Sequence, residues 1–228
     1  MSEDLNQLRD AIDCLDDEIL QTLTRRMRLS DQVIAAKNGV AAFRPGREAV
    51  LVRRLIAKSK ATGQSLAPEA IMGVWRQIMA ASLSRQNGEL ICAVHHQVLP
   101  AAAWHMGSAL AATVDEKIAP LIDAVAVGQC QYALVPADNN HHSELLASLD
   151  RHHHLKIIAR TPLYDMQAVK QAFIIADYLP DSSGDDISLY AVRREHGLNL
   201  VSIAGHYELA TPSGVPGDAR LIGAYACY

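Results

Sequence analysis

An amphipathic pattern in the first part of the chain constrains the fold more than any other feature. Apolar residues alternate three and four positions apart, which is typical of one face of an α-helix. These residues are Leu5, Leu8, Ile12, Leu15, Ile19, Leu23, Met27, Val33 and Ile34. A continuous helix of about 34 residues is about 50 Å long, too long to bury that face within a helical region of about 90 residues. We therefore expect the helix to pack against a partner, and a second copy of the chain is the simplest one.

Two shorter helices are predicted after the long one. The long helix is expected to stop at residues 37–39, where the sequence is Lys-Asn-Gly. The second begins after Arg44, with Pro45 in its first turn, and runs to Gly63. The third runs from Pro68 to Asn87. Three helices with too little protein to cover the first predict an all-α domain that forms an intertwined dimer.

The sequence changes character near residue 87. Before it, leucine, arginine and alanine recur with helical spacing, whereas after it short β-branched or aromatic runs alternate with turn-forming residues. We predict strands at 89–94, 131–136, 155–160, 172–178, 187–192, 198–205 and 220–226, and helices near 98–112, 115–127 and 142–150. The chain is thus predicted to be multi-domain, with an all-α domain at residues 1–87 and an α/β domain at residues 88–228.

Composition excludes several classes of partner. The chain has 228 residues, of which 50% are hydrophobic and 20% charged, and its formal net charge is -4. This balance provides no broad positive field for nucleic acid or an anionic membrane surface. The N-terminal sequence lacks the pattern of a signal peptide, and no apolar run approaches the ~18 residues of a membrane span. We expect a cytoplasmic protein whose basic patches bind something small.

Neither the cysteines nor the histidines indicate a metal or redox centre. The cysteines are Cys14, Cys92, Cys130 and Cys227. They form no CxxC pair, so we expect four reduced thiols. Histidines cluster at residues 95–96, 141–142 and 152–154, but without HxxxH or HExxH spacing. The sequence therefore predicts no metal site.

Two basic residues lie on or beside the apolar face of the long helix. Arg26 lies seven residues after Ile19 and seven before Val33, where the other residues should face a core. Lys37 follows eleven residues later, about three turns on, so both side chains project from one face with bases ~16 Å apart. Because an isolated buried charge is costly, the pair predicts a site for a small dianion.

The stretch FRPGRE adds charge at the start of the second helix. Arg44 and Arg47 stand on either side of a glycine, and Glu48 follows directly. Ser82 and Gln86, four residues apart, share a face near the end of the third helix. Taken alone, each of these residues is most simply a solvated surface group. Taken together, so many polar groups on or beside apolar faces favour an anion-binding site.

Three stretches carry these residues: LRDAIDCLDDEILQTLTRRMRLSDQVIAAK, FRPGREAVLVRRL and MAASLSRQ. They closely resemble the all-helical chorismate mutase family, including the domain fused to prephenate dehydratase in bifunctional enzymes. The resemblance covers residues 4 to 86 in order. It implies an intertwined homodimer that binds chorismate in two sites, each built mainly from one chain and completed by an arginine of the other.

The resemblance implies a role for each of these residues. Arg9 is the arginine donated to the partner's site, and Arg26 binds a carboxylate of the substrate. Lys37 contacts a carboxylate and the ether oxygen. Arg47 and Glu48 correspond to the family's Arg-Glu pair, in which Glu48 binds the substrate hydroxyl. Helix length supports the donation independently, because Arg9 lies about 25 Å along the helix from Arg26, too far for both to hold one small molecule.

The third helix and the FRPGRE stretch supply the remaining contacts. Gln86 is expected to face the ether oxygen, while Ser82 assists in anchoring a carboxylate. Arg44 departs from the family pattern, because many members have there an acidic residue that helps to hold the hydroxyl. We count it among the substrate-binding residues.

The implied reaction is the pericyclic rearrangement of chorismate to prephenate, on the route to phenylalanine and tyrosine. It needs no nucleophile or proton transfer, so we expect no cofactor. The site must hold the enolpyruvyl ether in its compact reactive conformer and stabilise negative charge on the ether oxygen. Lys37, Gln86, Arg26 and Glu48 are the predicted catalytic residues.

The C-terminal region resembles a shortened prephenate dehydratase with part of its phenylalanine-binding ACT module. The likeness is carried by DAVAVGQCQYALVPADNN, in which Asp138 replaces a glutamate, and by the stretch from residue 171 to 208. The family's Thr-Arg-Phe motif is replaced by Gln-Ala-Phe at 171–173. We therefore expect no dehydratase activity, and a regulatory or structural role with an aromatic amino acid as effector is the remaining hypothesis.

Two other functions stay open from the sequence. One is an isochorismate pyruvate lyase, which uses the same helical scaffold to split isochorismate into salicylate and pyruvate; Gln86 and the full arginine set favour the mutase. The other is a non-catalytic dimeric binding or regulatory protein of the aromatic pathway, for which Arg44 is the only hint.

Overall fold

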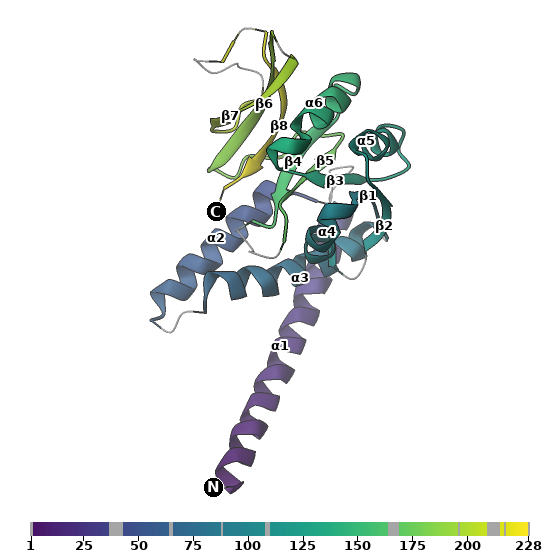
Figure 1. Ribbon diagram of the computed structural model, residues 1–228. Coiled ribbons are helices and arrows are strands. Elements are labelled where there is room, and N and C mark those ends of the chain that lie inside the picture. The colour runs from purple at the N-terminus through teal and green to yellow at the C-terminus, as the bar shows by residue number, and fades with distance from the viewer. Residues whose placement is uncertain are drawn as a thin grey trace.

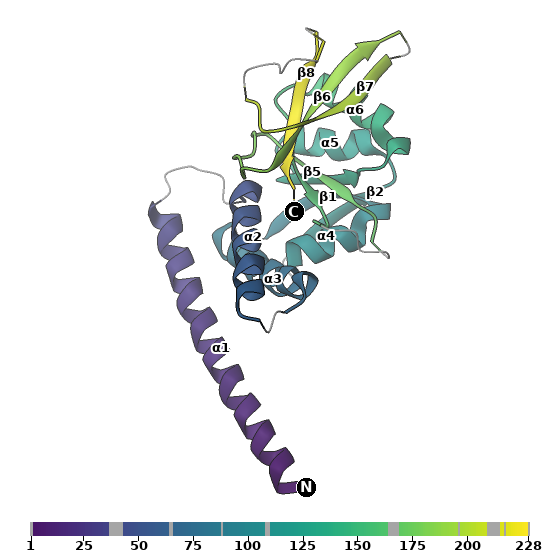
Figure 2. The same cartoon turned by 90° about the vertical axis from the view of Figure 1, so that its left-hand side faces the viewer.

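Three helices form the N-terminal part of the protein. The computed structural model describes residues 2–36, 43–63, 66–87, 89–107, 110–163, 169–195, 197–208, 215–216 and 218–227. Helix α1 spans Ser2–Ala36, α2 spans Pro45–Ala61 and α3 spans Pro68–Asn87. Helices α2 and α3 lie against the rest of the molecule, whereas α1 extends away from it as a single long rod (Figures 1 and 2). The three predicted helices are confirmed, and the predicted stop of the first, at 37–39, lies outside the described residues.

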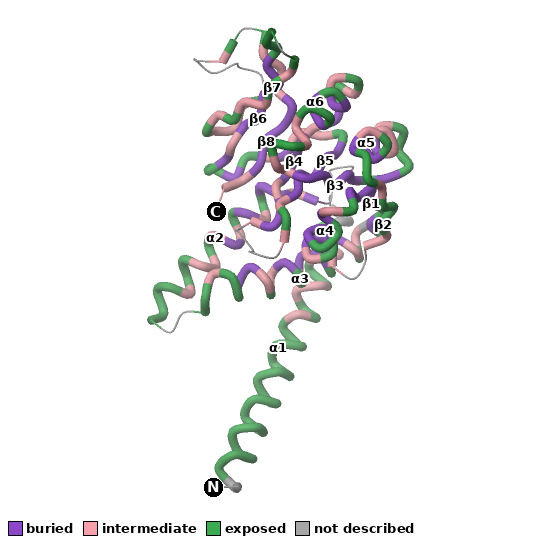
Figure 3. Tube along the Cα trace, in the orientation of Figure 1, coloured by how far each residue is buried: buried purple, intermediate pink, exposed green. Residues whose placement is uncertain are grey.

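The apolar face of α1 is exposed along the N-terminal half of the helix. Residues 4–22 are all exposed, which Figure 3 shows as an unbroken green segment. Five residues of the stripe keep between 49% and 58% of their surface accessible: Leu5, Leu8, Ile12, Leu15 and Ile19. The single chain thus leaves unburied the same face that the sequence pattern marks as a packing surface.

An eight-stranded sheet follows, in the order β2-β1-β3-β5-β4-β8-β6-β7. Its strands are β1 Leu90–His95, β2 Leu110–Asp115, β3 Tyr132–Pro136, β4 Lys156–Thr161, β5 Ala172–Ala176, β6 Asp186–Arg194, β7 Gly197–Ala204 and β8 Arg220–Ala226. Strand β1 runs parallel to β2 and β3, β5 is antiparallel to β3 and β4, and β8 runs parallel to β4 and antiparallel to β6. The helices are α4 Leu99–Met106, α5 Ile118–Ala126 and α6 His142–Arg151, with short 3-10 helices at His96–Val98 and Asn139–His141. The predicted α/β region is confirmed.

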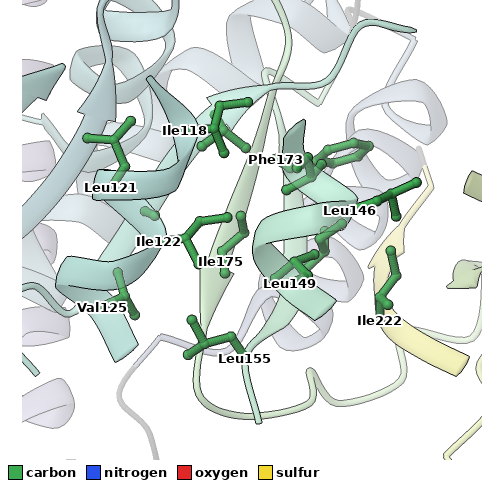
Figure 4. Close-up of a cluster of buried hydrophobic side chains, with 14 of the residues drawn as sticks. Ile118, Leu121, Ile122, Val125, Leu146, Leu149, Leu155, Phe173, Ile175 and Ile222 are labelled. Carbon is green, nitrogen blue, oxygen red and sulfur yellow. The ribbon is translucent and has the colours of Figure 1, made fainter. Parts of the chain in front are cut away.

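Each face of the sheet has its own hydrophobic core. On one face, α5 and α6 pack against β3, β4 and β5 through side chains such as Ile122, Leu149 and Ile175 (Figure 4). On the other face, α4 packs together with Phe43 and Leu83, which are 0% and 3% exposed. The helical part therefore contributes side chains to a core of the sheet, while the division at residues 87 and 88 stays a prediction.

One predicted helix is wrong in its second half. The helix expected over 98–112 ends at Met106, and Leu110–Asp115 forms the edge strand β2. Gly107 ends the helix with φ of +70°, a backbone conformation that favours glycine. The strand was hidden because its alanines favour helices and because an edge strand lacks the continuous apolar run of a buried one. Each of the seven predicted strands is confirmed.

Polar contacts fix α2 to the C-terminal part of the chain. Arg53 donates hydrogen bonds to the main-chain oxygens of Ser183 and of Cys227, the latter at 2.9 Å. The hydroxyl of Tyr178 donates to the main-chain oxygen of Phe43 at 2.9 Å. The first half of α2 is thereby held on the α/β region. No helix among the described residues has the length and apolar character needed to cross a membrane.

Candidate active site

A cavity of about 310 Å³ lies where α1, α2 and α3 meet. Its apolar wall is formed by Leu29, Val33, Leu51, Met79 and Leu83. Its polar wall is formed by Arg26, Ser30, Arg44, Arg47, Glu48, Ser82 and Gln86. The volume is at the small end of the range for ligand pockets, which suits a compact metabolite. The structure thus brings together six of the eight predicted site residues.

Arg26 is half-buried at the wall of this cavity. Its guanidinium donates a hydrogen bond to the hydroxyl of Ser82 at 2.7 Å, and that hydroxyl donates to the main-chain oxygen of Ile78 at 3.0 Å. Burial lowers the pKa of Arg26, and the nearby negative charge of Glu48 acts in the opposite direction. The Ser82 hydroxyl that accepts this hydrogen bond is neutral. An anion that enters the cavity would therefore gain a charge-assisted contact with Arg26.

Glu48 lines the cavity and also forms an ion pair with a buried arginine. Arg76 on α3 is 1% exposed and donates to both carboxylate oxygens of Glu48, at 3.3 Å for its Nη2 to Oε1. The Glu48 side chain retains 17% of its surface. The carboxylate predicted to bind a substrate hydroxyl is therefore oriented by a residue that sequence reasoning missed.

A signal for Arg76 was present in the sequence. Met72, Arg76, Met79 and Leu83 recur with helical spacing on the buried face of α3. Arg76 interrupts this stripe as Arg26 interrupts that of α1. Applying the same criterion to the third helix would have identified it.

Arg44 and Gln86 are each engaged by a second element. Arg44 lines the cavity just before α2 and forms an ion pair at 3.1 Å with Asp181 of the α/β region. The amide nitrogen of Gln86 donates to the hydroxyl of Ser30 at 2.9 Å, which connects α3 to α1. Arg47 lies on the first turn of α2 and is exposed at the cavity. The cavity thus combines cationic, anionic and amide groups around an apolar wall.

Of the two remaining predicted site residues, Arg9 is not brought to this cavity and Lys37 is not among the described residues. Arg9 lies on the exposed N-terminal half of α1 and is not among the residues that line it. Lys37 lies outside the described residues. Within the part of the chain that the structure describes, the cavity is built from one end of α1 only, as the length of that helix predicted.

The fold and the site define a three-helix domain, joined to an α/β region, with a cavity lined by three arginines and one glutamate. Residues 8–87 match the family model described as chorismate mutase type II, and this segment includes most of α1 and all of α2 and α3. The chain therefore contains a chorismate mutase type II domain, as its resemblance to that family implied.

Two curated relatives extend the similarity into the α/β region. The bifunctional chorismate mutase/prephenate dehydratase of Neisseria gonorrhoeae is 27% identical over 157 residues, which are 66% of this chain and 42% of that protein. The enzyme of the same description from Pseudomonas aeruginosa is 25% identical over 158 residues, 65% of this chain and 42% of the relative. The chain spans less than half the length of the curated relatives it matches.

Two solved structures give weaker matches. One is a quorum-quenching acylase, GqqA, at 14% identity and a TM-score of 0.46, over 62% of this chain and 97% of the other. The second is prephenate dehydratase from Streptococcus mutans, at 15% identity and a TM-score of 0.33, over 60% and 99%.

Proposed function

We propose that the protein is a chorismate mutase that converts chorismate to prephenate in the cavity between α1, α2 and α3. The observation that carries this proposal is the wall of the cavity in a chorismate mutase type II domain. Arg26 and Arg47 present positive charge there, Gln86 an amide and Glu48 a carboxylate. Chorismate carries two carboxylates, a hydroxyl and an ether oxygen, and this set offers a partner for each.

The proposed mechanism relies on positioning and electrostatics. Arg26 and Arg47 anchor the carboxylates, with Ser82 holding Arg26, so that the flexible ether is kept in its compact conformer. Gln86 and Lys37 stabilise the negative charge that develops on the ether oxygen as the C–O bond breaks. An acceleration of ~10⁶-fold corresponds to about 8 kcal/mol, which these two effects can jointly supply. No cofactor takes part in this scheme.

The substrate hydroxyl is assigned to Glu48. A carboxylate can accept about four hydrogen bonds, and Arg76 uses two of these positions. The remaining acceptor capacity lies at the cavity, because the side chain is partly exposed there. Arg44 pairs with Asp181, so we assign it to shaping the mouth of the site around the hydroxyl contact.

We further propose that the site is completed by a second copy of the chain. The exposed apolar stripe of α1 is long enough for an antiparallel partner helix, and its burial would remove a large apolar surface from water. In that arrangement Arg9 of the partner subunit reaches the cavity and binds a substrate carboxylate. A cytoplasmic homodimer with two shared sites is the assembly that follows.

The activity is tested by adding purified protein to chorismate and identifying the product. The mutase proposal expects loss of chorismate with formation of prephenate. Salicylate and pyruvate formed from isochorismate would instead establish the lyase, and binding of either compound without turnover would establish a non-catalytic binding protein. Substrate that remains unchanged after prolonged incubation overturns the proposed function.

The shared site is tested by mixing two inactive variants. Arg9→Ala and Arg26→Ala should each lose most activity as homodimers. In a mixed dimer, one site receives an intact Arg26 from one subunit and an intact Arg9 from the other. Activity should therefore return toward a quarter of the native value after the variants are mixed and re-equilibrated, since about half of the dimers are mixed and each has one intact site. Mixtures that stay inactive would contradict the donation of Arg9.

For the α/β region, absence of dehydratase activity and binding of an aromatic amino acid stay predictions. Phe173, in the position of the replaced motif, is 4% exposed and belongs to a hydrophobic core rather than to a polar site. A prephenate turnover assay checks the first prediction. Thermal unfolding with phenylalanine or tyrosine checks the second, since a ligand that binds the native state raises the unfolding temperature.

A further inference from the structure

Arg76 occupies the boundary between the three helices and the α/β region. It lies on α3 with 1% of its surface exposed, and its guanidinium contacts Glu48 on α2 and His105 on α4. Glu48 is the only carboxylate with which the described residues pair it. A guanidinium this deeply buried depends on that carboxylate for charge neutralisation.

Arg76 also contacts His105, and His105 in turn contacts Thr161. The Nε2 atom of His105 lies 3.4 Å from Nη1 of Arg76, and its Nδ1 atom lies 2.9 Å from the hydroxyl of Thr161 at the end of β4. Burial, assisted by the charge of Arg76, holds the pKa of His105 well below its usual value, so the ring is neutral. Because arginine only donates, Nε2 must accept and the Nδ1–H must donate to Thr161.

This arrangement fixes His105 before any substrate is present. The imidazole is 2% exposed, Thr161 is 0% exposed, and the ring of Phe43 packs edge-on against His105 with centroids 5.3 Å apart. The α/β region thus supplies a rigid neutral acceptor for one N–H of Arg76. The remaining strong acceptor within reach is the carboxylate of Glu48, so that carboxylate has one favourable orientation.

A second conformation of Glu48 would be costly. Rotating the carboxylate fully into the cavity would leave a buried guanidinium without a counter-charge. On the side away from the cavity, Glu48 borders a small gap that is also lined by Pro45, Ala159 and Arg160. Arg76 therefore holds Glu48 at the cavity wall in the position that the hydroxyl contact requires.

We propose that Arg76 is a positioning residue of the mutase reaction, acting through Glu48 and supported by His105 and Thr161 of the α/β region. This inference rests on the proposed function. It assigns the α/β region a share in the mutase site, because the support for a substrate-contacting carboxylate comes from α4 and β4.

The test is a double-mutant cycle between Arg76 and Glu48. Arg76→Gln should lower kcat/KM about tenfold to a hundredfold in the native background, because misplaced catalytic groups cost factors of this size. In the Glu48→Gln background, where there is no carboxylate to position, the same change should lower kcat/KM by less than about twofold. Arg76→Lys, which keeps the charge but not the two-bond geometry, should restore part of the loss.

Arg53→Gln is the matched control. Arg53 also connects the helices to the α/β region, through main-chain oxygens of Ser183 and Cys227, but it has no part in the cavity. Its effect should be the same in both backgrounds, whatever its size. Thermal unfolding of every variant shows that each is folded under assay conditions, and if Arg76→Gln does not fold, Arg76→Lys takes its place in the cycle.

The outcomes separate the two proposals. A native protein without mutase activity removes the proposed function, and this inference falls with it. A native enzyme that is active, with an Arg76 variant that costs the same factor with and without Glu48, overturns the positioning role while leaving the function intact. A loss confined to the native background establishes that Arg76 acts through Glu48.

Discussion

Helices α1 and α3 each carry an arginine within an apolar stripe, and the two arginines have opposite surroundings. Arg26 on α1 is half-buried beside a cavity, and its hydrogen-bond partner there is the neutral hydroxyl of Ser82. Arg76 on α3 is fully buried, and both oxygens of the Glu48 carboxylate accept from it. An arginine within an apolar stripe is therefore neutralised by a carboxylate of the protein on α3, whereas on α1 it borders a cavity.

The difference teaches how to separate a structural charge from a functional one. A buried cation that the protein neutralises itself stabilises one arrangement of the fold, and its removal leaves an uncompensated charge. A cation at a cavity whose hydrogen-bond partner is a neutral hydroxyl can still bind an anion that enters the cavity. Changes at Arg26 should therefore act mainly on catalysis, whereas changes at Arg76 should lower stability strongly and act on catalysis only through Glu48.

The largest effect on stability is expected from Arg76→Met. It leaves the Glu48 carboxylate without its buried counter-charge, and we expect the free energy of unfolding to fall by about 3–5 kcal/mol in urea denaturation. Arg85→Met is the control on the same helix, since Arg85 binds Asp31 through two contacts at 3.1 and 2.6 Å but is exposed. A loss no larger than that of the control would show that the comparison is wrong.

Arg26→Gln should have the converse effect. We expect kcat/KM to fall by about 10²-fold, because Arg26 anchors a substrate carboxylate and a misplaced substrate costs a factor of this size. Stability should change by less than about 1 kcal/mol, because the lost partner is a neutral hydroxyl. Steady-state kinetics and urea denaturation of the same preparation measure both. Near-native turnover would show that Arg26 does not bind the substrate.

Leu15→Ala extends the comparison to the apolar stripe itself. Leu15 is 57% exposed in the single chain, so its burial depends on a partner. Removing about 2 kcal/mol of apolar contact should weaken self-association by at least about tenfold. Sedimentation velocity over a dilution series measures this, with Val127→Ala, also exposed but in the α/β region, as control. A native chain that is monomeric at every concentration would contradict the proposed dimer.

The smallest effect is a dependence of stability on pH through His105. Because its pKa is lowered in the folded protein from 6.5, the unfolded chain binds a proton first as the pH falls. Stability should therefore decrease below about pH 6.5, by at most about 1.4 kcal/mol per pH unit from this group. Unfolding temperatures at pH 7.5, 6.5 and 5.5 measure the slope. His105→Gln should reduce it, whereas His153→Gln, on an exposed side chain, should not.

Much of the helical site could be predicted because its residues are related by helical spacing or by family resemblance. Arg26, Ser82 and Gln86 meet at one cavity as expected, since each position on a helix fixes a face. The contacts that join the two regions could not be predicted in this way. Arg76 and Glu48 are 28 residues apart and Arg44 and Asp181 are 137 apart, so only the tertiary fold brings them together.

The sheet also contains a strand that local sequence patterns did not predict. Buried strands such as β3 and β5 were predicted because their sequences are continuously apolar, whereas the edge strand β2 was read as helix. The ion pair of Arg44 was not predicted either, because Asp181 lies on a distant loop. Local patterns predicted the helices and most of the strands, whereas the ion pairs of Glu48 and Arg44 form between residues far apart in the sequence.

The insertion of Phe43 and Leu83 into the core of the sheet has a practical consequence for protein engineering. A gene cut at the change in sequence character would separate these side chains from the strands that cover them and expose apolar surface on both products. Such fragments should aggregate when expressed alone and recover solubility when co-expressed. The two regions therefore cannot be separated at the change in sequence character near residue 87 without exposing part of a shared core.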